Sequence, residues 1–356
     1  MQQLPLPAKI DLETISVLKK NAQAHRYLAE LKGISATIPN EAILINTLTL
    51  QEAKDSSEIE NIITTHDDIY KASLFSDSQI NPVAKEVQDY AYALKHGFDL
   101  VRDNKIIRLS DILTIQEILE KNKAGLRRLP GTGLKNNKTG EIVYMPPQSA
   151  IEVEQLMSNL VEYINDDELC SLDPLIKMAI VHHQFESIHP FYDGNGRTGR
   201  IVNIIYLVAK GLLDLPVLYL SRYFIQNKTE YYQQLQDVRD TGDWEQWVIY
   251  MLEGIAVTSQ KTISLVEKIK SLMMEYKHGI REKLPKIYRQ ELINNLFKHP
   301  YTKIDFVMVD LGVSRITATK YLESLVEEGF LCKRKIGRSN YYINEPLFSI
   351  FIEPHN

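Results

Sequence analysis

The chain has 356 residues, a net charge of −5 and a hydrophobic content of 44%. This length suggests two or three domains with a large core, and the mildly acidic balance gives no global case for nucleic-acid binding. Two cysteines, Cys170 and Cys332, lack metal-ligand spacing and fit a reducing compartment. Residues 1–10 do not resemble a signal peptide, and no apolar run approaches the roughly 20 residues of a membrane span. We expect a cytoplasmic protein.

Residues 1–95 are predicted to be a helical N-terminal region. Apolar residues between Leu12 and Leu28 recur at helical spacing, and a second helix begins near Pro39. Within that helix or just after it comes Ser56-Ser57-Glu58-Ile59-Glu60-Asn61. Ser57 and Glu60 have the three-residue offset of a capping box, so the spacing alone favours an ordinary helix cap.

The middle of the chain contains more helices and one predicted hairpin. Helices are expected near 82–100, 110–123 and, after a cap formed by Ser149 with Glu152, up to Ile164. Between them, residues 129–147 are rich in Gly and Asn, and Asn-Lys-Thr-Gly separates two short strand patterns. This pattern predicts a hairpin whose second strand, Glu141 to Tyr144, has a free edge.

Two apolar helices, near 172–185 and 201–213, bracket the stretch His189 to Arg200. The first of them carries His182 and His183, whose side chains diverge by about 100° on a helix. We therefore predict that these two histidines are core or supporting residues and do not form a joint metal site. A loop held between two buried helices is a rigid place for chemistry.

The residues of this loop suit a polyphosphate. Gly194 and Gly196 allow the backbone to approach a ligand closely, and a helix that starts near Arg197 points its amides at an anion. Arg197 and Arg200 lie three residues apart on one helix face and offer planar forks for phosphate oxygens. No Gly-Lys-Ser/Thr follows, so the stretch is not a Walker A loop.

Two further side chains add reactivity to the predicted phosphate site. Asp193 is a hard oxygen ligand suited to Mg²⁺ beside phosphates. His189 titrates near neutrality and can take a proton from an attacking hydroxyl. The residues alone thus describe a polyphosphate site with its own base, although a plain turn between two core helices is the simpler alternative.

The stretch resembles the signature of Fic proteins, H-x-F-x-[DE]-G-N-G-R-x-x-R, at every fixed position. The resemblance implies an enzyme that moves AMP from ATP to a protein hydroxyl, with Mg²⁺ or, alternatively, Mn²⁺ as cofactor. It implies that His189 is the base, that Asp193 holds the metal and that Phe191 anchors the loop. The remaining residues of the implied ATP site are the anion hole of Gly194, Asn195 and Gly196, the phosphate-holding Arg197 and Arg200, and the intervening Thr198 and Gly199.

The upstream stretch resembles the inhibitory motif of Fic proteins, [ST]-x-x-x-E-[GN], with Ser56, Glu60 and Asn61 at its fixed positions. A carboxylate at Glu60 could pair with Arg200 in a two-pronged bond and keep it from the γ-phosphate. ATP would then bind with its α-phosphate misaligned for in-line attack. The helix cap remains the alternative.

Two more resemblances concern substrates. The predicted hairpin resembles the flap of Fic proteins, in which Ile142, Val143 and Tyr144 would hold a target segment by strand addition. A plain surface hairpin is the alternative.

A pair of tyrosines often lines the base pocket in Fic proteins, so Tyr231, Tyr232 and Trp244 are candidate adenine contacts. Aromatic residues are more often core, and that alternative stays open.

A long helix near 247–276 leads to a predicted winged helix at 284–356. Its helix-turn-helix spans 304–329, and its wing strands lie near 330–335 and 341–344. Basic residues that could contact DNA phosphates are Arg315, Lys320, Lys333, Arg334, Lys335 and Arg338. Glutamates dilute that face, and winged helices also serve as dimerisation or protein-docking modules, so DNA binding and a homodimer both stay open.

We therefore predict a mainly α fold. It comprises a helical N-terminal region (1–95), a Fic helical core with a hairpin flap (96–255), a helical linker (256–283) and a C-terminal winged helix (284–356). The predicted activity is AMP transfer from Mg-ATP to Ser, Thr or Tyr hydroxyls of an unknown target protein or of the chain itself, inhibited by Glu60.

Three other functions are weighed against this prediction. In an AMP-removing enzyme, Glu60 would orient a water and His189 would protonate the leaving hydroxyl. In a kinase of the related Doc type, a lysine replaces the second glycine of the anion hole, but this chain has Gly196. A DNA-binding regulator with an inactive Fic domain is the third alternative.

Overall fold

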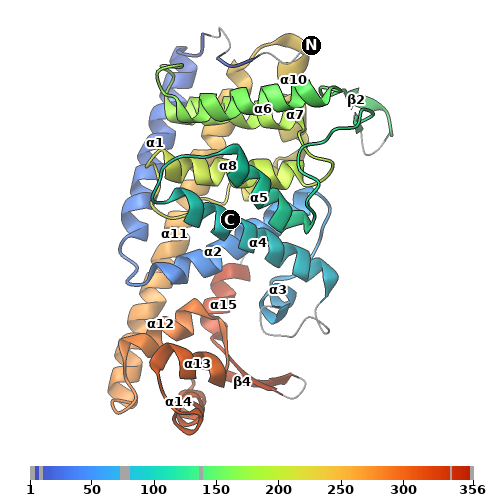
Figure 1. Cartoon of the computed structure of the whole chain (residues 1–356). Helices are drawn as coiled ribbons and strands as arrows, with labels where there is room; N and C mark the ends of the chain where they lie inside the picture. Colours follow the sequence, from blue (N-terminus) through green and yellow to red (C-terminus); the bar gives the residue numbers. More distant parts are fainter. Residues whose placement is uncertain (1–4, 8–10, 73–80, 136–138, 337–338, 353–356) are drawn as a thin grey trace.

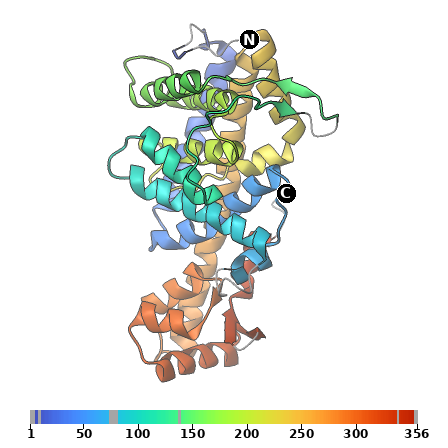
Figure 2. The ribbon, with the colours of Figure 1, turned by 45° about the vertical axis from the view of Figure 1, so that its right-hand side comes forward.

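The computed structural model of the protein describes residues 5–7, 11–72, 81–135, 139–336 and 339–352. The molecule is elongated, with a large helical body and a smaller C-terminal domain, and one long helix runs through both (Figures 1 and 2). The fold is mainly α, as predicted.

The N-terminal region consists of α1 (Ile15–Ser35), α2 (Glu41–Ile59), α3 (His66–Ala72) and α4 (Pro82–Val101). Side-chain caps start the first two helices, since Thr14 accepts a hydrogen bond from the Val17 amide and Asn40 accepts one from Ala42. α1 packs along the long helix α11 (Glu245–Lys283), while α2 packs against α4 and the short helix α9 (Ser221–Gln226). These contacts place the end of α2 inside the helical body.

The central part holds two almost completely buried helices. Its other elements surround them: α5 (Leu109–Glu120), β1 (Leu134–Lys135), β2 (Ile142–Tyr144), α6 (Ala150–Asn165), α9 and α10 (Lys228–Thr241). The two central helices are α7 (Pro174–Ile188) and α8 (Asn195–Ala209), which pack on each other. Every residue of α7 from Leu175 to Ile188 is buried, so the loop that joins α7 to α8 starts and ends in the core.

The C-terminal domain has the element order typical of a winged helix. It contains α12 (Gln290–Lys298), β3 (Tyr301–Thr302), α13 (Ile304–Leu311), α14 (Arg315–Glu327), β4 (Cys332–Ile336), β5 (Ser339–Ile343) and α15 (Glu345–Ile352). The strands form an antiparallel sheet in the order β3-β5-β4. Tyr301 links this domain to the body, because its hydroxyl donates to Asp67 Oδ1 at 2.6 Å and its ring stacks on Tyr70.

Several boundaries differ from the sequence-based expectation. α4 runs continuously through residue 95, and residues 256–283 are the second part of α11. α3, β3 and α15 are too short for a periodicity argument and were not expected. Ser149 precedes α6, but its side chain accepts no capping bond. The turn residues 137–138 and 337–338, including Arg338, lie outside the described residues.

None of the described helices is long and apolar enough to cross a membrane.

Candidate active site

The loop between α7 and α8 is fixed from within. Phe191 is completely buried, and the Asn195 side chain both accepts from the Phe191 amide at 2.8 Å and donates to its carbonyl at 2.9 Å. Gly194 caps α8 with a φ of 78°, a left-handed conformation that favours glycine. The loop therefore presents the first amides of α8 in one fixed orientation, which is the arrangement expected of an anion hole.

Arg127 braces the same loop from outside the motif. Its Nε donates to the His189 carbonyl at 2.7 Å, and its Nη2 donates to the carbonyls of Ile188 and Pro147. His189 has a φ of 49°, an uncommon conformation for a residue with a side chain. Arg127 thus ties the chain after the hairpin to the backbone of His189. This role could not be predicted from the sequence, because a lone arginine 62 positions upstream carries no local signal.

His189 lies at the end of α7 in a partly buried position. Burial, followed by the positive charges of Arg127 and Arg239, lowers the pKa of His189 to about 4. The imidazole is therefore neutral at physiological pH and has a free lone pair, as a general base requires.

His182 and His183 are buried on α7, as predicted for supporting residues. The ring of His182 hydrogen-bonds the Tyr231 hydroxyl at 2.9 Å, and that of His183 hydrogen-bonds the Leu235 carbonyl at 3.1 Å. Burial lowers the pKa of both to about 3, so neither carries a charge into the site.

Arg200 is held by the end of α2. Its Nε donates to Ser56 Oγ at 2.8 Å, and its Nη2 donates to the Ser56 carbonyl at 3.0 Å and to Glu60 Oε1 at 2.8 Å. The sequence predicted a two-pronged Glu60–Arg200 bond, but Glu60 accepts one hydrogen bond from Arg200 and Ser56 accepts the other two. Ser56 occupies one side of the guanidinium group because the C-terminal turn of α2 brings its hydroxyl and carbonyl there.

The Glu60 carboxylate lies on the anion hole itself. A Cβ atom added to Gly196 would come within 2.4 Å of Glu60 Oε1, so carboxylate and glycine are in direct contact. Burial raises the pKa of Glu60, but the charge and hydrogen bond of Arg200 outweigh it, and the pKa falls below its ordinary value. An ionised carboxylate thus occupies the place that suits a phosphate oxygen.

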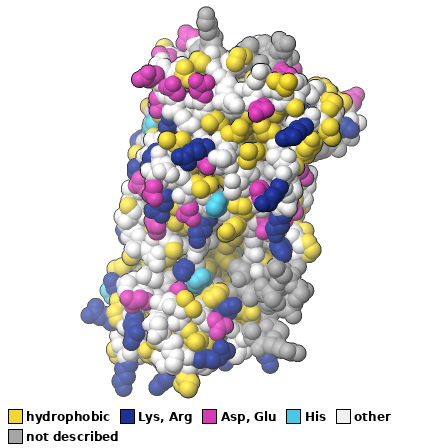
Figure 3. Space-filling view, in the orientation of Figure 1, with side chains coloured by type: hydrophobic (Ala, Val, Ile, Leu, Met, Phe, Trp, Pro, Cys, Tyr) yellow, Lys and Arg dark blue, Asp and Glu magenta, His cyan; other side chains and the backbone are white. Residues whose placement is uncertain are grey.

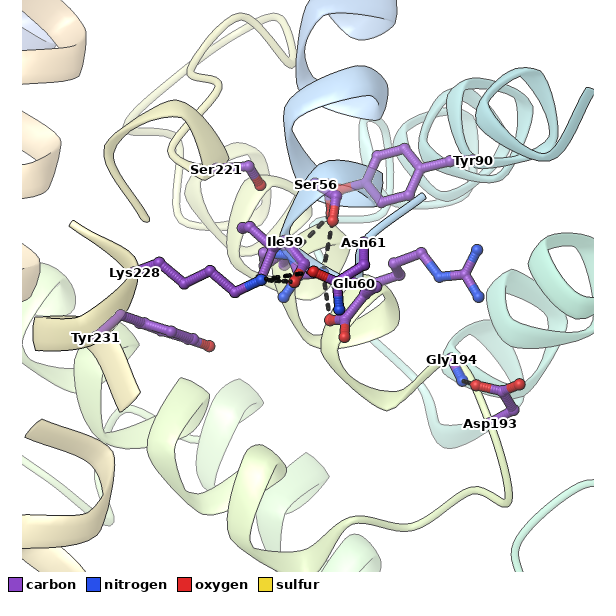
Figure 4. A network of polar contacts seen from close by, with 12 residues as sticks. Ser56, Ile59, Glu60, Asn61, Tyr90, Asp193, Gly194, Ser221, Lys228 and Tyr231 are labelled. Carbon is purple, nitrogen blue, oxygen red and sulfur yellow. Dashed lines mark hydrogen bonds and ion pairs between the residues drawn. The ribbon is translucent and has the colours of Figure 1, made fainter. Parts of the chain in front are cut away.

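The helix-cap interpretation of this stretch is wrong. Ser57 lies inside α2, and Glu60 follows the last residue of that helix, so neither starts a helix. Asn61 has a φ of 65°, the left-handed conformation in which helices commonly end and which Gly or Asn tolerates. Lys228 holds this end, because its Nζ donates to the Ile59 carbonyl at 2.6 Å and to Asn61 Oδ1 at 3.3 Å (Figure 4).

Arg197 is also paired, with carboxylates from two other helices. Its Nη2 donates to Glu120 Oε1 at 2.8 Å, and its Nη1 donates to Glu86. Both arginines of the motif therefore lie beside the anion hole with their charges neutralised by this chain. Thr198 and Gly199 are buried against α7, where Gly199 leaves room for Phe185 and Glu186.

The candidate adenine contacts lie in different surroundings. Tyr231 is 1% exposed, stacks on Phe224 and meets His182 through its hydroxyl, whereas Tyr232 is 44% exposed and packs edge-on against Tyr231. Trp244 is buried with its ring edge-on to His183. Of the three, Tyr232 is exposed to solvent, with the buried Tyr231 in contact with it.

The predicted hairpin is present. β1 and β2 pair antiparallel, with Leu134 opposite Tyr144. Ile142 and Val143 are exposed, whereas Tyr144 is buried and donates from its hydroxyl to the Ser187 carbonyl. Hydrophobic side chains gather on the surface around this hairpin (Figure 3). The hairpin thus offers apolar side chains outward and is anchored through Tyr144 to the end of α7, next to the α7–α8 loop.

Asp193 is exposed at the rim of the anion hole. Its Oδ1 accepts a hydrogen bond from the Gly194 amide at 2.7 Å, which orients the carboxylate. Among the described residues no group of three or more His, Cys, Asp or Glu side chains could hold a metal ion. A single carboxylate fits Mg²⁺, which usually keeps several waters and binds substrate phosphates in such sites.

Three of the predicted DNA-contacting residues pair with carboxylates of the same domain. Their partners are Asp305 for Arg315, Glu323 for Lys333 and Glu345 for Arg334. Lys and Arg side chains gather at the outer end of the C-terminal domain, with acidic side chains among them (Figure 3). These internal pairs reduce the positive charge available to phosphates.

Three family models match the chain in succession. They are the Fic/DOC family N-terminal domain at residues 18–99, the Fic/DOC family at 106–207, and the C-terminal domain described as "Protein adenylyltransferase SoFic-like" at 272–347. The chain belongs to the Fic/DOC family. The second match contains the whole His189–Arg200 loop, and the first contains Glu60.

Relatives of this Fic protein are named protein adenylyltransferases. Protein adenylyltransferase fic-1 of Caenorhabditis elegans is 27% identical over 161 residues, which are 44% of this chain and 30% of that protein. Protein adenylyltransferase Fic of Drosophila willistoni is 28% identical over 156 residues, which are 43% of this chain and 29% of that protein. This Fic protein thus matches less than a third of the length of these relatives.

Solved structures share the fold. A Fic family protein from Desulfovibrio desulfuricans G20 aligns with a TM-score of 0.59 and 20% identity, covering 95% of this chain and 97% of that one. A Fic-1 fragment from C. elegans aligns with a TM-score of 0.54 and 21% identity, covering 70% and 74%. The first alignment extends over both the helical body and the C-terminal domain.

Proposed function

We propose that this Fic protein is a protein adenylyltransferase that moves AMP from ATP to a Ser, Thr or Tyr hydroxyl of a target protein, including itself. The observation that carries the proposal is the Glu60 carboxylate, an anion of the chain's own, seated on Gly196 beside Arg200. A place that accepts this anion also suits a phosphate. The names of the relatives support the same activity.

In the proposed reaction the hydroxyl oxygen of the target attacks the α-phosphorus of ATP. The bond from that phosphorus to the bridging oxygen breaks, and pyrophosphate leaves. His189 takes the hydroxyl proton as general base, a role that suits its neutral imidazole. The amides of the anion hole and the freed guanidinium of Arg200 stabilise charge on the phosphates.

Asp193 and the hairpin supply the proposed contacts to the metal and to the target. Asp193 would hold Mg²⁺, which when bound neutralises phosphate charge and orients the leaving group. The outward side chains of Ile142 and Val143 support the proposal that β2 receives an extended target segment by strand addition.

Inhibition by Glu60 follows from its position. While its carboxylate pairs with Arg200 and lies on Gly196, the γ-phosphate has neither partner, and a negative charge repels it. The proposal therefore includes a resting state that transfers AMP slowly and an active state in which Glu60 has left the anion hole.

The test uses ATP labelled in its α-phosphate, the purified chain and a lysate as the source of targets. Glu60→Gly should give strong label transfer, the parent weak transfer, and Glu60→Gly/His189→Ala none above background. Label retained by the His189→Ala double variant would contradict the role of the base, and no label with any variant would contradict AMP transfer. AMP removal from a premodified target that requires Glu60 would instead support the AMP-removing alternative.

A further inference from the structure

Two further carboxylates, from α4 and α5, pair with the other arginine of the motif. Arg197, in the first turn of α8, is 4% exposed. Its Nη2 donates to Glu120 Oε1 at 2.8 Å and its Nη1 donates to Glu86. Each end of its guanidinium group thus meets a carboxylate, one from α5 and one from α4.

Glu120 also touches the anion hole directly. A Cβ atom added to Gly194 would lie 2.4 Å from Glu120 Oε1, the same distance that separates a Cβ at Gly196 from Glu60 Oε1. The two glycines of the anion hole are therefore each covered by a carboxylate. Glu60 pairs with Arg200, and Glu120 pairs with Arg197.

Three features of its surroundings disfavour the ionised form of Glu120. It is the last residue of α5, where the helix dipole disfavours an anion. Burial raises its pKa, and among the charges around it Asp193, Glu86 and Glu60 raise it further, while Arg197 lowers it. A residue that breaks local rules in this way is a candidate for a functional role.

We propose that Glu120 is a second inhibitory carboxylate, which holds Arg197 and places a negative charge at Gly194, where a phosphate of ATP would bind. The inference rests on the proposed function, because it takes ATP phosphates to be the anion that competes with Glu120. Removing Glu60 then opens only one half of the anion hole, and phosphate binding at the other half still has to displace Glu120.

Glu86 has a weaker part in this arrangement. Its side chain is 39% exposed, and it meets Arg197 without covering a glycine of the anion hole. Solvent screens a carboxylate in that position more than it screens Glu120, whose side chain is 12% exposed. Neutralising Glu86 should therefore tighten ATP binding, but less than neutralising Glu120 does.

The experiment measures the dissociation constant of Mg-ATP by isothermal titration calorimetry in the full chain carrying Glu60→Gly. Adding Glu120→Gln, which keeps the shape and removes the charge, should tighten ATP binding by about tenfold, or about 1.4 kcal/mol. Adding Glu86→Gln should tighten it less. Glu117→Gln, three residues earlier on α5 and paired with Lys123 rather than Arg197, is the matched control and should change nothing.

Transfer kinetics give a second measurement. In the Glu60→Gly background, Glu120→Gln should lower KM for ATP and leave kcat nearly unchanged, because it removes a competitor for ground-state phosphate binding. If Glu120→Gln does not fold, as judged by its melting curve, Glu120→Ala is used with the same expectation.

Unchanged or weaker ATP binding in the Glu120 variants would overturn the inference. Weaker binding would mean that Glu120 orients Arg197 for the phosphates. Failure of the proposed function has a different signature, since Glu60→Gly itself would then bind no Mg-ATP. Tightening by Glu120→Gln equal to that by the Glu117→Gln control would also contradict the inference, because it would show a general charge effect of α5.

Discussion

The catalytic loop and the end of α2 meet at one anion hole, but they are held in different ways. The loop is fixed by its own core residue Phe191, by the Asn195 brace and by the buried Arg127. The end of α2 is held at the site through side-chain contacts of Ser56, Glu60 and Lys228, and the Glu60 side chain is 35% exposed. The first region is held by buried groups, whereas the proposed activation requires the partly exposed Glu60 carboxylate of the second region to leave the anion hole.

Removing Arg127, which holds the backbone of the α7–α8 loop, should change the rate of AMP transfer most. Arg127→Met leaves the carbonyls of Pro147, Ile188 and His189 without this donor and frees the backbone of His189. Because a misplacement of about 1 Å can cost roughly 10²-fold in rate, we expect a loss of about that size in the Glu60→Gly background. Label transfer measures it, and Arg128→Met, an exposed neighbour, is the control. Equal rates for the two variants would show that the loop needs no brace.

The pH dependence of AMP transfer tests whether burial lowers the pKa of His189 as far as the structure indicates. With a pKa of about 4, His189 stays unprotonated as the pH falls well below neutrality. An ordinary imidazole with a pKa near 6.5 would lose about fourfold in rate at pH 6. We expect Glu60→Gly at saturating Mg-ATP to keep nearly its full kcat at pH 6. A half-maximal rate near pH 6.5 would contradict this expectation.

Weakening the contacts that hold the end of α2 should raise AMP transfer moderately. Lys228→Met removes the donor that holds the Ile59 carbonyl and Asn61, so α2 should end less firmly and Glu60 should leave the anion hole more often. Since a charged hydrogen bond contributes about 1.5–3 kcal/mol at most, we expect a gain of about fivefold in label transfer.

The gain from Lys228→Met should vanish in the Glu60→Gly background, because no inhibitory carboxylate remains there. The matched control is Gln233→Met, an exposed position on the same helix α10. A gain that persists without Glu60 would mean that Lys228 acts on ATP binding directly.

The smallest effect concerns how α2 is anchored in the body. Glu52 accepts hydrogen bonds from the Tyr90 hydroxyl at 3.1 Å and the Ser221 amide at 3.1 Å, and burial raises its pKa from 4.5 to about 7. Because the unfolded chain ionises above 4.5 and the folded chain only near 7, this group contributes stability that is lost as the pH rises between these values.

Glu52→Gln removes that titration. The melting temperature of the variant relative to the parent should therefore rise by a few degrees from pH 5 to pH 8. Glu58→Gln, at a partly exposed position of the same helix, is the control. A difference between variant and parent that stays constant with pH would contradict the account of Glu52.

The sequence predicted the family and the mainly α fold, but not the contacts around the α7–α8 loop. The apolar helices on either side of His189–Arg200 and the fixed positions of the motif are local, so fold and candidate site followed from adjacent residues. Ser57 and Glu60 matched a helix start, although they lie at a helix end, because the capping offset occurs in both places. Asn61, a residue that tolerates the left-handed conformation, was the signal that could have decided between them.

Charged partners from distant parts of the chain could not be predicted. Glu86, Glu120, Arg127 and Lys228 are single charged residues on elements that look like ordinary solvated surface in sequence. Tertiary packing brings Glu86, Glu120 and Arg127 to the α7–α8 loop and Lys228 to the end of α2, and only the structure shows which group each one meets.

Glu60 is proposed to inhibit AMP transfer by holding Arg200. This proposal is tested most directly by measuring self-modification with labelled ATP in Glu60→Gly, Arg200→Ala and the double variant. Both single changes break the same ion pair, but only Glu60→Gly leaves an arginine for the γ-phosphate. The account predicts a large gain for Glu60→Gly, no gain for Arg200→Ala, and a double variant that resembles Arg200→Ala. A rate for Glu60→Gly equal to that of the parent would contradict it.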